Sequence, residues 1–378
     1  MSVDHVHIVC QAGKIPNDPW FSSADVTFHD VLKKGQYISS YSQFRNVLKG
    51  IDILHVYSGN WLTNLASSIQ QVPVLVGPST HITSKLNYPW VKLTSTRYVF
   101  TSHRPLSIAY HSYKIADKDI AYVPAACDTE HFKPSTSDSR ERLSSKLDTE
   151  LNENVIFWPN HIRAHKRPLL AVDAFRALRE HRDDVSLLIA GDGPLTEEVC
   201  DAISSVPDTH YVGYIQHRDL NDYYAAADLT LLTSKSEGCP NVLRESMACE
   251  TPLVTATDFE KIGTKEFGVY LSSDSTPEEI ADGIEDCLPD VAALGPECRE
   301  YILKNYSMSA RANRFEALYR WVAGDETQPR ESLRWMKDNL CLFGGRNFIT
   351  ETTDKDDPLQ FSYKREWQLC ETVPPHNV

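Results

Sequence analysis

The stretch that decides the fold is ADLTLLTSKSEGCPNVLRESMACETPLVTA, residues 227–256. It opens with the apolar run Leu229–Thr233, passes through a Gly-Cys-Pro turn into a segment of helical spacing that begins near Asn241, and closes with a second apolar run, Pro252–Ala256. A strand, a helix and another strand in this order form a βαβ unit, which requires parallel strands. The stretch therefore predicts an α/β fold.

The same alternation continues upstream of this stretch. Apolar runs predict strands at Val155–Pro159, Val185–Ala190 and His210–Tyr214. Between the first two, Pro168–Glu180 is predicted to be a helix, with Pro in its first turn. Its apolar stripe, spaced three residues apart, consists of Leu169, Val172, Phe175 and Leu178.

The first part of the chain has a strand rhythm of its own. Its predicted strands are His5–Gln11, Asp52–Ser58, Pro73–Gly77, Arg97–Ser102 and Asp119–Pro124. The polar stretch Lys133–Asn154 then interrupts the rhythm and favours a domain boundary. We therefore predict two doubly wound α/β domains facing each other across a cleft, residues 1–148 and 149–325. The last helix is expected at Ala310–Val322, and residues 326–378 are expected to form a surface tail with a frayed end.

Composition narrows the class of protein. The 378 residues are 41% hydrophobic and 24% charged, which is typical of a soluble globular enzyme and excludes a wholly disordered chain. Basic residues number 38 and acidic residues 52, for a net charge of −14, so nucleic acid is not expected as the main partner. The first 150 residues are close to neutral, which suits that domain better for an anionic or membrane-borne molecule.

Nine cysteines occur without a C-x-x-C pair, which disfavours both a disulfide framework and a zinc cluster. They indicate reduced thiols in a cytoplasm. The longest apolar runs fall far below the roughly 18 residues of a membrane span. We therefore expect a cytoplasmic protein that is attached, at most, to the inner membrane surface.

The turn before Asn241 predicts an anion site, because a helix that starts there directs free N–H groups and the positive end of its dipole at the space above the strand. Glu237 precedes the turn, and Glu245 follows two helical turns later. A carboxylate beside an anion site can accept hydrogen bonds from a sugar diol. The alternative is that both are solvated acids beside a helix, since the E-x7-E spacing alone is a weak signal.

Three cations, Arg163, Lys166 and Arg167, lie between a predicted strand and the helix that starts near Pro168. They are placed to meet a second face of the same phosphate group. An ordinary basic surface loop explains Arg163 and Arg167 equally well, so Lys166 is the strongest candidate.

The chain contains, in this order, IAYVPAACDTEHFKP, NHIRAHKRP with LLAVDAF, LLIAGDGPL and the stretch of residues 227–256 quoted above. This succession resembles the retaining nucleotide-sugar glycosyltransferases of glycosyltransferase family 4. The resemblance spans roughly residues 1–325 and is tightest between Val155 and Ile262. It implies the GT-B fold, in which two Rossmann-like domains bind the acceptor and the donor. No cofactor is expected besides the nucleotide-sugar donor.

The resemblance also implies roles for single residues. Glu237 would contact the donor sugar, Glu245 the ribose hydroxyls and Lys166 the diphosphate. Arg163 is expected to assist Lys166, because the arginine that usually lies five residues before that lysine is replaced by His161. The backbone amides that hold the diphosphate would be those of Asn241, Val242 and Leu243.

The resemblance also implies roles for two residues of the first domain. In the second domain this chain departs from the family pattern at one further position. Gly13 would lie in a turn near the donor phosphates. His81 would lie close to the reacting sugar, although a lone histidine is equally well explained as a loop or core residue. The usual glycine after the E-x7-E helix is Glu250 here.

The implied reaction transfers a sugar to an acceptor glycan, a lipid-linked sugar or another hydroxyl compound, with retention at the anomeric carbon. No metal site is expected, because cations and a helix terminus can stabilise the diphosphate. The acidic cluster Asp354–Asp357 is interpreted as a solvated turn. A GT-B-fold nucleotide-sugar epimerase and a non-catalytic sugar-binding protein with a decayed site are the alternatives.

A basic segment with interleaved aromatic residues suggests how an acceptor could be held. Its members are Lys33, Lys34, Tyr37, Tyr41, Phe44, Arg45 and Lys49. Such a patch can bind a lipid-linked or anionic acceptor near a membrane surface. An ordinary solvated helix is the favoured alternative.

Overall fold

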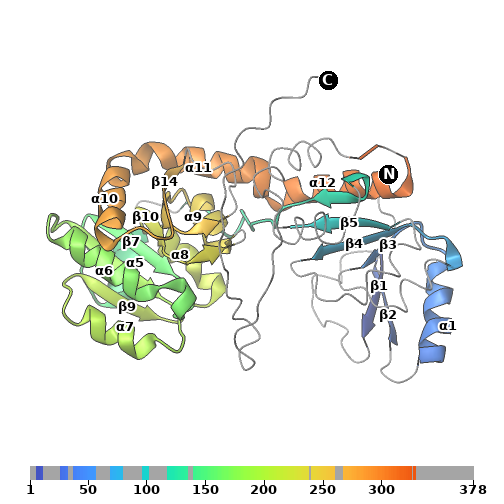
Figure 1. The fold of residues 1–378 in the computed structure, drawn as a ribbon, viewed down its shortest axis with the longest axis horizontal. Helices are drawn as coiled ribbons and strands as arrows, with labels where there is room; N and C mark the ends of the chain where they lie inside the picture. Colours follow the sequence, from blue (N-terminus) through green and yellow to red (C-terminus); the bar gives the residue numbers. More distant parts are fainter. Residues whose placement is uncertain are drawn as a thin grey trace. The chain divides into compact units, whose positions relative to one another are not determined.

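The computed structural model divides the chain into two compact units, each described by itself (Figure 1). Unit 1 comprises Met1–Val123 and Arg314–Val378, and unit 2 comprises Pro124–Asn313. The structure describes residues 6–11, 26–32, 37–56, 69–79, 96–101, 117–134, 139–237, 240–259, 267–325 and 327–328.

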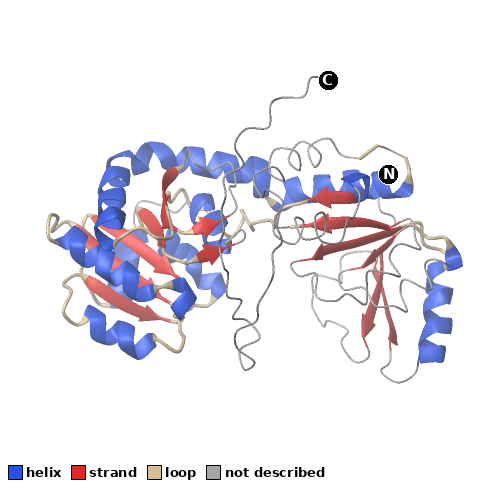
Figure 2. Ribbon diagram, viewed as in Figure 1, coloured by secondary structure: helices blue, strands red, loops and turns tan. Residues whose placement is uncertain are grey.

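Unit 2 is built on a six-stranded sheet whose neighbouring strands are all parallel. The strands, in spatial order, are β14 (Gly268–Leu271), β12 (Leu253–Ala256), β10 (Leu229–Leu232), β7 (Asn154–Pro159), β8 (Val185–Ala190) and β9 (Thr209–Gly213). Figure 2 shows helices around these strands. The sheet order reverses at β7, so the edge beside β7 and β10 is where a doubly wound sheet binds ligands.

Alternate residues of β7 enter two different cores, because side chains of a strand point to opposite faces. Ile156 and Trp158 pack with α6 (Pro168–Arg179) and α10 (Pro277–Cys287). Val155 and Phe157 belong to the second core. That core also contains residues of α5 (Ser139–Leu147), α8 (Leu220–Tyr224), α9 (Asn241–Ala248) and α11 (Val291–Tyr306).

Unit 1 contains a four-stranded parallel sheet and a separate parallel pair. The sheet consists of β3 (Leu54–Val56), β4 (Val74–Ser79), β5 (Thr96–Phe100) and β6 (Ile120–Tyr122), and the pair of β1 (Val6–Gln11) and β2 (Val26–Leu32). Helix α1 (Tyr37–Leu48) contributes buried Phe44 and Leu48 to a core with Val74.

Helix α12 (Met308–Ala323) departs from the predicted domain organisation. Its residues Leu318, Trp321 and Val322 pack in one core with buried residues of the unit 1 sheet, Leu75, Val99 and Ala121. The Tyr319 hydroxyl also lies 2.9 Å from His55 Nδ1. The chain therefore returns to unit 1 at Arg314, and unit 2 begins at Pro124 rather than at residue 149. Contacts between segments far apart in the sequence decide this division, and composition does not report them.

The predicted strands of unit 2 agree with the structure to within one residue at each end. Strand β14 was missed, because its four residues follow a polar, glycine-containing segment. The apolar stripe of α6 was wrong at Leu169, which is exposed, whereas Ala171 and Ala174 are buried. Small residues on the packed face of this helix carry little hydrophobic signal, although they let α10 approach closely.

The aromatic part of the basic patch lies in the core of unit 1. Phe44 is buried, and Tyr41 packs against the same core, while Arg45 and Lys49 are exposed. Lys33 and Lys34 lie outside the described residues. The described part of the patch is therefore an amphipathic helix with an apolar inner face and a solvated outer face.

Candidate active site

Two loops at the carboxyl ends of the central strands are joined by hydrogen bonds. The loop of residues 160–167 follows β7, and the segment of residues 233–237, which ends in the two-residue strand β11 (Ser236–Glu237), follows β10. Lys235 donates its backbone N–H to the His165 carbonyl at 2.8 Å. The Thr233 hydroxyl lies 2.9 Å from the Lys166 carbonyl oxygen and 3.0 Å from that of Arg167.

A buried tryptophan fixes this junction from below. Trp158 donates its indole Nε1–H to Thr233 Oγ1 at 2.9 Å, and both residues are fully buried. Thr233 therefore acts as acceptor and donor at once, which fixes the rotamer of its hydroxyl. The sequence offers no signal for this link, because Trp158 and Thr233 are 75 residues apart.

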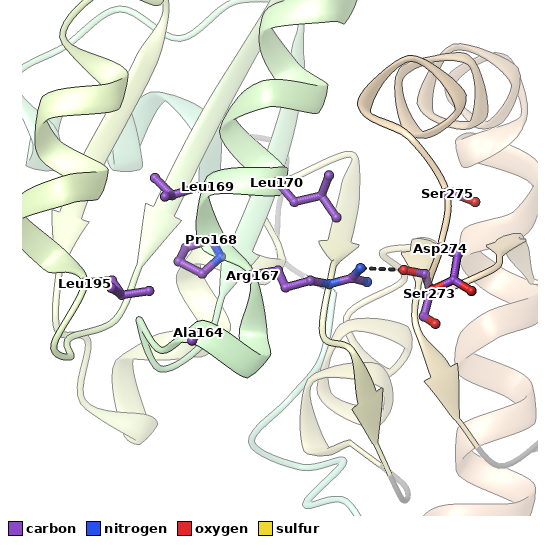
Figure 3. A pocket seen from close by; sticks show the side chains of 9 residues that line it. All are labelled: Ala164, Arg167, Pro168, Leu169, Leu170, Leu195, Ser273, Asp274 and Ser275. Carbon is purple, nitrogen blue, oxygen red and sulfur yellow. Dashed lines mark hydrogen bonds between the residues drawn. The ribbon is translucent and has the colours of Figure 1, made fainter. Parts of the chain in front are cut away.

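Arg167 is part of the framework rather than a ligand-facing cation. Its guanidinium donates to the backbone carbonyls of Thr233, at 2.6 Å, and of Ala256 and Ser273. Figure 3 shows the bond to Ser273. Burial lowers the pKa of the Arg167 guanidinium, and Asp274 opposes this shift. The interpretation of Arg167 as a phosphate-facing cation or a free surface residue is therefore wrong.

The start of α6 also lines an open pocket of about 570 Å³ (Figure 3). Its lining residues are Ala164, Arg167, Pro168, Leu169, Leu170, Leu195, Ser273, Asp274 and Ser275. Of the site candidates named from the sequence, Arg167 alone lines it, through the guanidinium already bonded to backbone carbonyls. The predicted chemistry lies instead at Lys166, Glu237 and the start of α9.

Lys166 and Glu237 form an ion pair, although 71 residues separate them in the sequence. Their side chains are 15% and 16% exposed, so both are largely desolvated but reachable. The pairing brings together the residue expected at the diphosphate and the one expected at the donor sugar. A ligand in which a sugar is joined directly to a diphosphate would present its groups to both.

Helix α9 begins at Asn241, and within the described residues no side chain caps its first turn. The preceding residue is Pro240, and the Asn241 side chain accepts a hydrogen bond from Arg244 instead of capping the helix. The first amides of a helix have no intrahelical partner, so those of Asn241, Val242 and Leu243 stay available as donors. The Leu243 side chain is fully buried, which restricts any role of this residue to its backbone.

Glu245 is 7% exposed and is held by two side chains that the sequence analysis did not identify. The Tyr224 hydroxyl donates to its Oε2 at 3.1 Å, and His217 Nε2 lies 3.0 Å from its Oε1. Burial, together with the charge of Glu245, raises the pKa of Tyr224 well above its usual value. Tyr224 therefore stays protonated and serves as a permanent donor. The sequence shows Tyr224 only as part of an apolar helix, which hid this role.

The remaining predicted residues are only partly covered by the described segments. Arg163 is exposed and directly precedes the short 3-10 helix η3 (Ala164–Lys166). His161, at the position of the usual arginine, is exposed as well. Gly13 and His81 lie outside the described residues, so their roles stay predictions.

Two glycines hold the 160–167 loop against the turn after β8. A Cβ on Gly191 would lie 1.8 Å from the Asn160 carbonyl oxygen, and one on Gly193 would lie 2.2 Å from that of Ile162. Only residues without a side chain permit this approach. The Gly-Asp-Gly turn thus positions the loop that carries Lys166.

Glu250 occupies the position of the usual glycine with a left-handed backbone, at φ 64°. It follows α9 in a Schellman arrangement, in which Thr251 N–H donates to Ser246 O and Glu250 N–H to Met247 O. The helix terminus thus keeps its ordinary geometry without glycine. Glutamate in place of the usual glycine therefore carries the cost of a left-handed backbone at this position, and it leaves Glu245 in place.

Two further findings concern the described part of the chain. No group of three or more His, Cys, Asp or Glu side chains there could hold a metal ion. None of the helices in the same segments combines the length and apolar character needed to cross a membrane.

Comparison with known proteins gives one family match. Residues 152–290 match the family described as glycosyl transferases group 1. The chain is 23% identical over 227 residues to the lipopolysaccharide 1,2-N-acetylglucosaminetransferase of Salmonella typhimurium, covering 55% of this chain and 58% of that protein. The chain spans between about a third and three fifths of the length of the curated relatives it matches.

Solved structures share the fold over more of the chain. A glycosyltransferase from Rickettsia africae superposes with a TM-score of 0.71 at 17% identity, covering 85% of this chain and 91% of that one. Anabaena Alr3699/HepE in complex with UDP-glucose gives a TM-score of 0.56 at 17% identity, covering 83% and 99%. The two parallel-sheet units and these superpositions show the GT-B fold, and the family match over residues 152–290 together with the curated relatives supports a glycosyltransferase of the family 4 type.

Proposed function

We propose that this chain transfers a sugar from a nucleoside-diphosphate sugar to an acceptor hydroxyl, with retention at the anomeric carbon and without a divalent metal. One observation carries the proposal: Lys166, Glu237, the uncapped start of α9 and Glu245 belong to adjoining elements at one edge of the unit 2 sheet. The cation and the free amides match the diphosphate of such a donor. The carboxylates of Glu237 and Glu245 match its sugar and its ribose.

The assigned roles follow from the chemistry of each group. Lys166 and the amides of Asn241, Val242 and Leu243 bind the diphosphate, and Arg163 assists from the loop. Glu245 accepts the ribose hydroxyls, and Glu237 orients the donor sugar. The roles that the family resemblance implies for Gly13, at the donor phosphates, and for His81, at the reacting sugar, are kept as part of the proposal.

The site lowers the barrier to transfer by electrostatic stabilisation of the leaving group. As the bond between the anomeric carbon and the diphosphate oxygen breaks, negative charge grows on the leaving group. Lys166 and the helix amides are fixed before the reaction begins, so they stabilise that charge without reorganising. The acceptor oxygen bonds to the same face of the sugar, which preserves the anomeric configuration, and the acceptor proton passes to the departing diphosphate oxygen.

A metal is unnecessary in this scheme because the site supplies its own positive charge. Glu245 is held by Tyr224 and His217, and Glu237 is paired with Lys166. In the proposed scheme Glu245 is used by the ribose hydroxyls and Glu237 by the donor sugar, so neither carboxylate is left to share a phosphate-bound Mg²⁺.

The printed names of related proteins support the class of substrate. A GDP-mannose-dependent mannosyltransferase of Mycobacterium tuberculosis, which matches 45% of this chain at 26% identity, acts on a phosphatidylinositol dimannoside. The Anabaena structure contains UDP-glucose. We extend the donor class, and a glycan or lipid-linked acceptor, to this chain as part of the proposal.

The test begins with thermal unfolding in the presence of uridine, guanosine and adenosine diphosphates and their sugars. A bound donor raises the melting temperature by mass action. Release of nucleoside diphosphate is then measured with the best donor, with and without excess EDTA, and the product anomer is assigned by NMR. Transfer should persist in EDTA with retention. Loss of activity that Mg²⁺ or Mn²⁺ restores, or an inverted product, would refute the corresponding part of the proposal.

The same assay separates the two alternatives. A binding protein would be stabilised by a donor without releasing nucleoside diphosphate. An epimerase would invert a sugar stereocentre of the donor in the absence of any acceptor.

A further inference from the structure

Two side chains contact the carboxylate of Glu245, one from the protein interior and one from the side that faces solvent. Tyr224, which is fully buried, donates to Oε2 at 3.1 Å. His217, whose side chain is 67% exposed, lies 3.0 Å from Oε1 through Nε2. Because an ionised carboxylate only accepts hydrogen bonds, Nε2 must carry the proton in this contact.

These two bonds leave each carboxylate oxygen with room for one more donor. A carboxylate has about four acceptor positions, two on each oxygen. Tyr224 uses one on Oε2 and His217 uses one on Oε1. A vicinal diol has two hydroxyl donors side by side, so it can donate one hydrogen bond to each of the two remaining acceptor positions.

The His217 ring is itself restrained by aromatic neighbours. Phe132 meets it edge to face, with ring centroids 5.1 Å apart. His131 lies nearly parallel to it, at an interplanar angle of 23° and a centroid distance of 6.3 Å. Both neighbours come from the segment after β6, so an element remote in the sequence orients the imidazole.

Stability alone does not explain this arrangement. Hydrogen bonds between an exposed side chain and a carboxylate contribute little to folding, because water competes for both partners. Tyr224 already satisfies the buried side of Glu245. His217 adds a second fixed point at the side that solvent, and therefore a ligand, can reach.

We propose that His217 is a positioning residue that holds Oε1 of Glu245 in the orientation that accepts a ribose diol. This inference rests on the proposed function, since it requires Glu245 to bind a ribonucleotide. Without His217 the carboxylate regains rotational freedom on its exposed side. Diol binding must then fix the carboxylate of Glu245 again, and the entropy cost of this ordering lowers the affinity.

The experiment compares two ligands that differ only in the diol. Binding of the ribonucleoside diphosphate that most stabilises the wild-type chain, and of its 2′,3′-dideoxy counterpart, is measured by isothermal titration. His217→Ala should weaken the ribonucleotide about tenfold and leave the dideoxy ligand within about twofold. His217→Gln, whose amide nitrogen can donate from a similar position, should restore most of the loss. In turnover, His217→Ala should raise the donor KM and spare kcat.

Controls separate positioning from folding. His181→Ala removes an exposed histidine at the end of α6 and should change neither affinity. Thermal unfolding of each variant reports whether the fold is intact. An equal loss for both ligands would show that His217 supports the nucleotide or the fold in general, and would overturn the inference.

Other outcomes are equally decisive. Unchanged ribonucleotide affinity in His217→Ala would overturn the inference, and tighter binding would show instead that His217 competes with the diol. A wild-type chain that binds both ligands equally would exclude the ribose role of Glu245 while leaving nucleotide binding intact. A wild-type chain that binds no nucleoside diphosphate would refute the proposed function and this inference together.

Discussion

Helices α6 and α9 start at the same edge of the unit 2 sheet, each after a loop that carries a cation or a proline, yet they use their first turns differently. At α6 the preceding residue, Arg167, donates to carbonyls of Thr233, Ala256 and Ser273, and Pro168 has no N–H to offer. At α9 the first amides, those of Asn241 to Leu243, have no side-chain cap among the described residues. The fold uses the charge before α6, whereas no described side chain occupies the start of α9, where we propose that the diphosphate binds.

The difference shows why a basic motif cannot be interpreted as one unit. Lys166 and Arg167 are adjacent, but Lys166 pairs with Glu237 while Arg167 is directed into the framework. A left-handed backbone at Arg167, φ 51°, accompanies this change of direction. The following predictions test the division between ligand-facing and framework groups.

The largest effect is expected at Lys166. Lys166→Ala removes the cation that we propose stabilises the leaving group, so the turnover rate should fall by about 10²- to 10³-fold. Thermal stability should change little, since the ion pair is partly exposed and contributes modestly to folding. Single-turnover rates with the best donor measure the effect. Lys304→Ala, an exposed lysine on α11, is the matched control, and a similar loss there would contradict a site-specific role.

Arg167 should show the opposite pattern. Arg167→Gly relieves the left-handed backbone but leaves several carbonyls without their donor, so the free energy of unfolding should fall by about 2–4 kcal/mol. Urea unfolding monitored by tryptophan fluorescence measures it. If Arg167→Gly unfolded at the wild-type urea concentration and reduced turnover alone, Arg167 would belong with the ligand-facing groups.

These contrasts also mark what the sequence could predict. Local patterns identified five of the six strands of the unit 2 sheet and the start of α9, and they marked Lys166 and Glu237 as separate candidates, because strand periodicity and turn chemistry are properties of neighbouring residues. The links from Trp158 to Thr233 and from His217 to Glu245 join distant segments, and nothing in either segment alone indicates them. The return of α12 to unit 1 was missed for the same reason.

A change at Asn241 can make α9 resemble α6. Asn241→Pro removes one free amide at the first helical position, where proline is tolerated, and Pro240 already has the extended backbone that a following proline requires. Affinity for the nucleoside diphosphate should fall about fivefold with little change in stability. Asn241→Ala keeps the amide and controls for loss of the side chain. If both variants bound the nucleotide like wild type, the start of α9 would not hold the diphosphate.

The smallest effect, and the only stabilising one, is expected at Glu250. Like Arg167 it has a left-handed backbone, at φ 64°, but no described hydrogen bond or ion pair of its side chain accompanies that conformation. Glycine adopts it without a Cβ clash, and the Schellman bonds from Thr251 and Glu250 use backbone atoms that glycine also has. The left-handed cost of about 1–2 kcal/mol is partly offset by the greater freedom of glycine in the unfolded chain. Glu250→Gly should therefore stabilise unit 2 by about 0.5–1 kcal/mol and raise its melting temperature by about 1–4 °C.

Glu250→Ala, which removes the carboxylate but keeps the Cβ, should not reproduce the gain. If alanine stabilised as much as glycine, the carboxylate rather than the backbone would be the source of the cost, and the comparison with Arg167 would rest on charge instead of conformation.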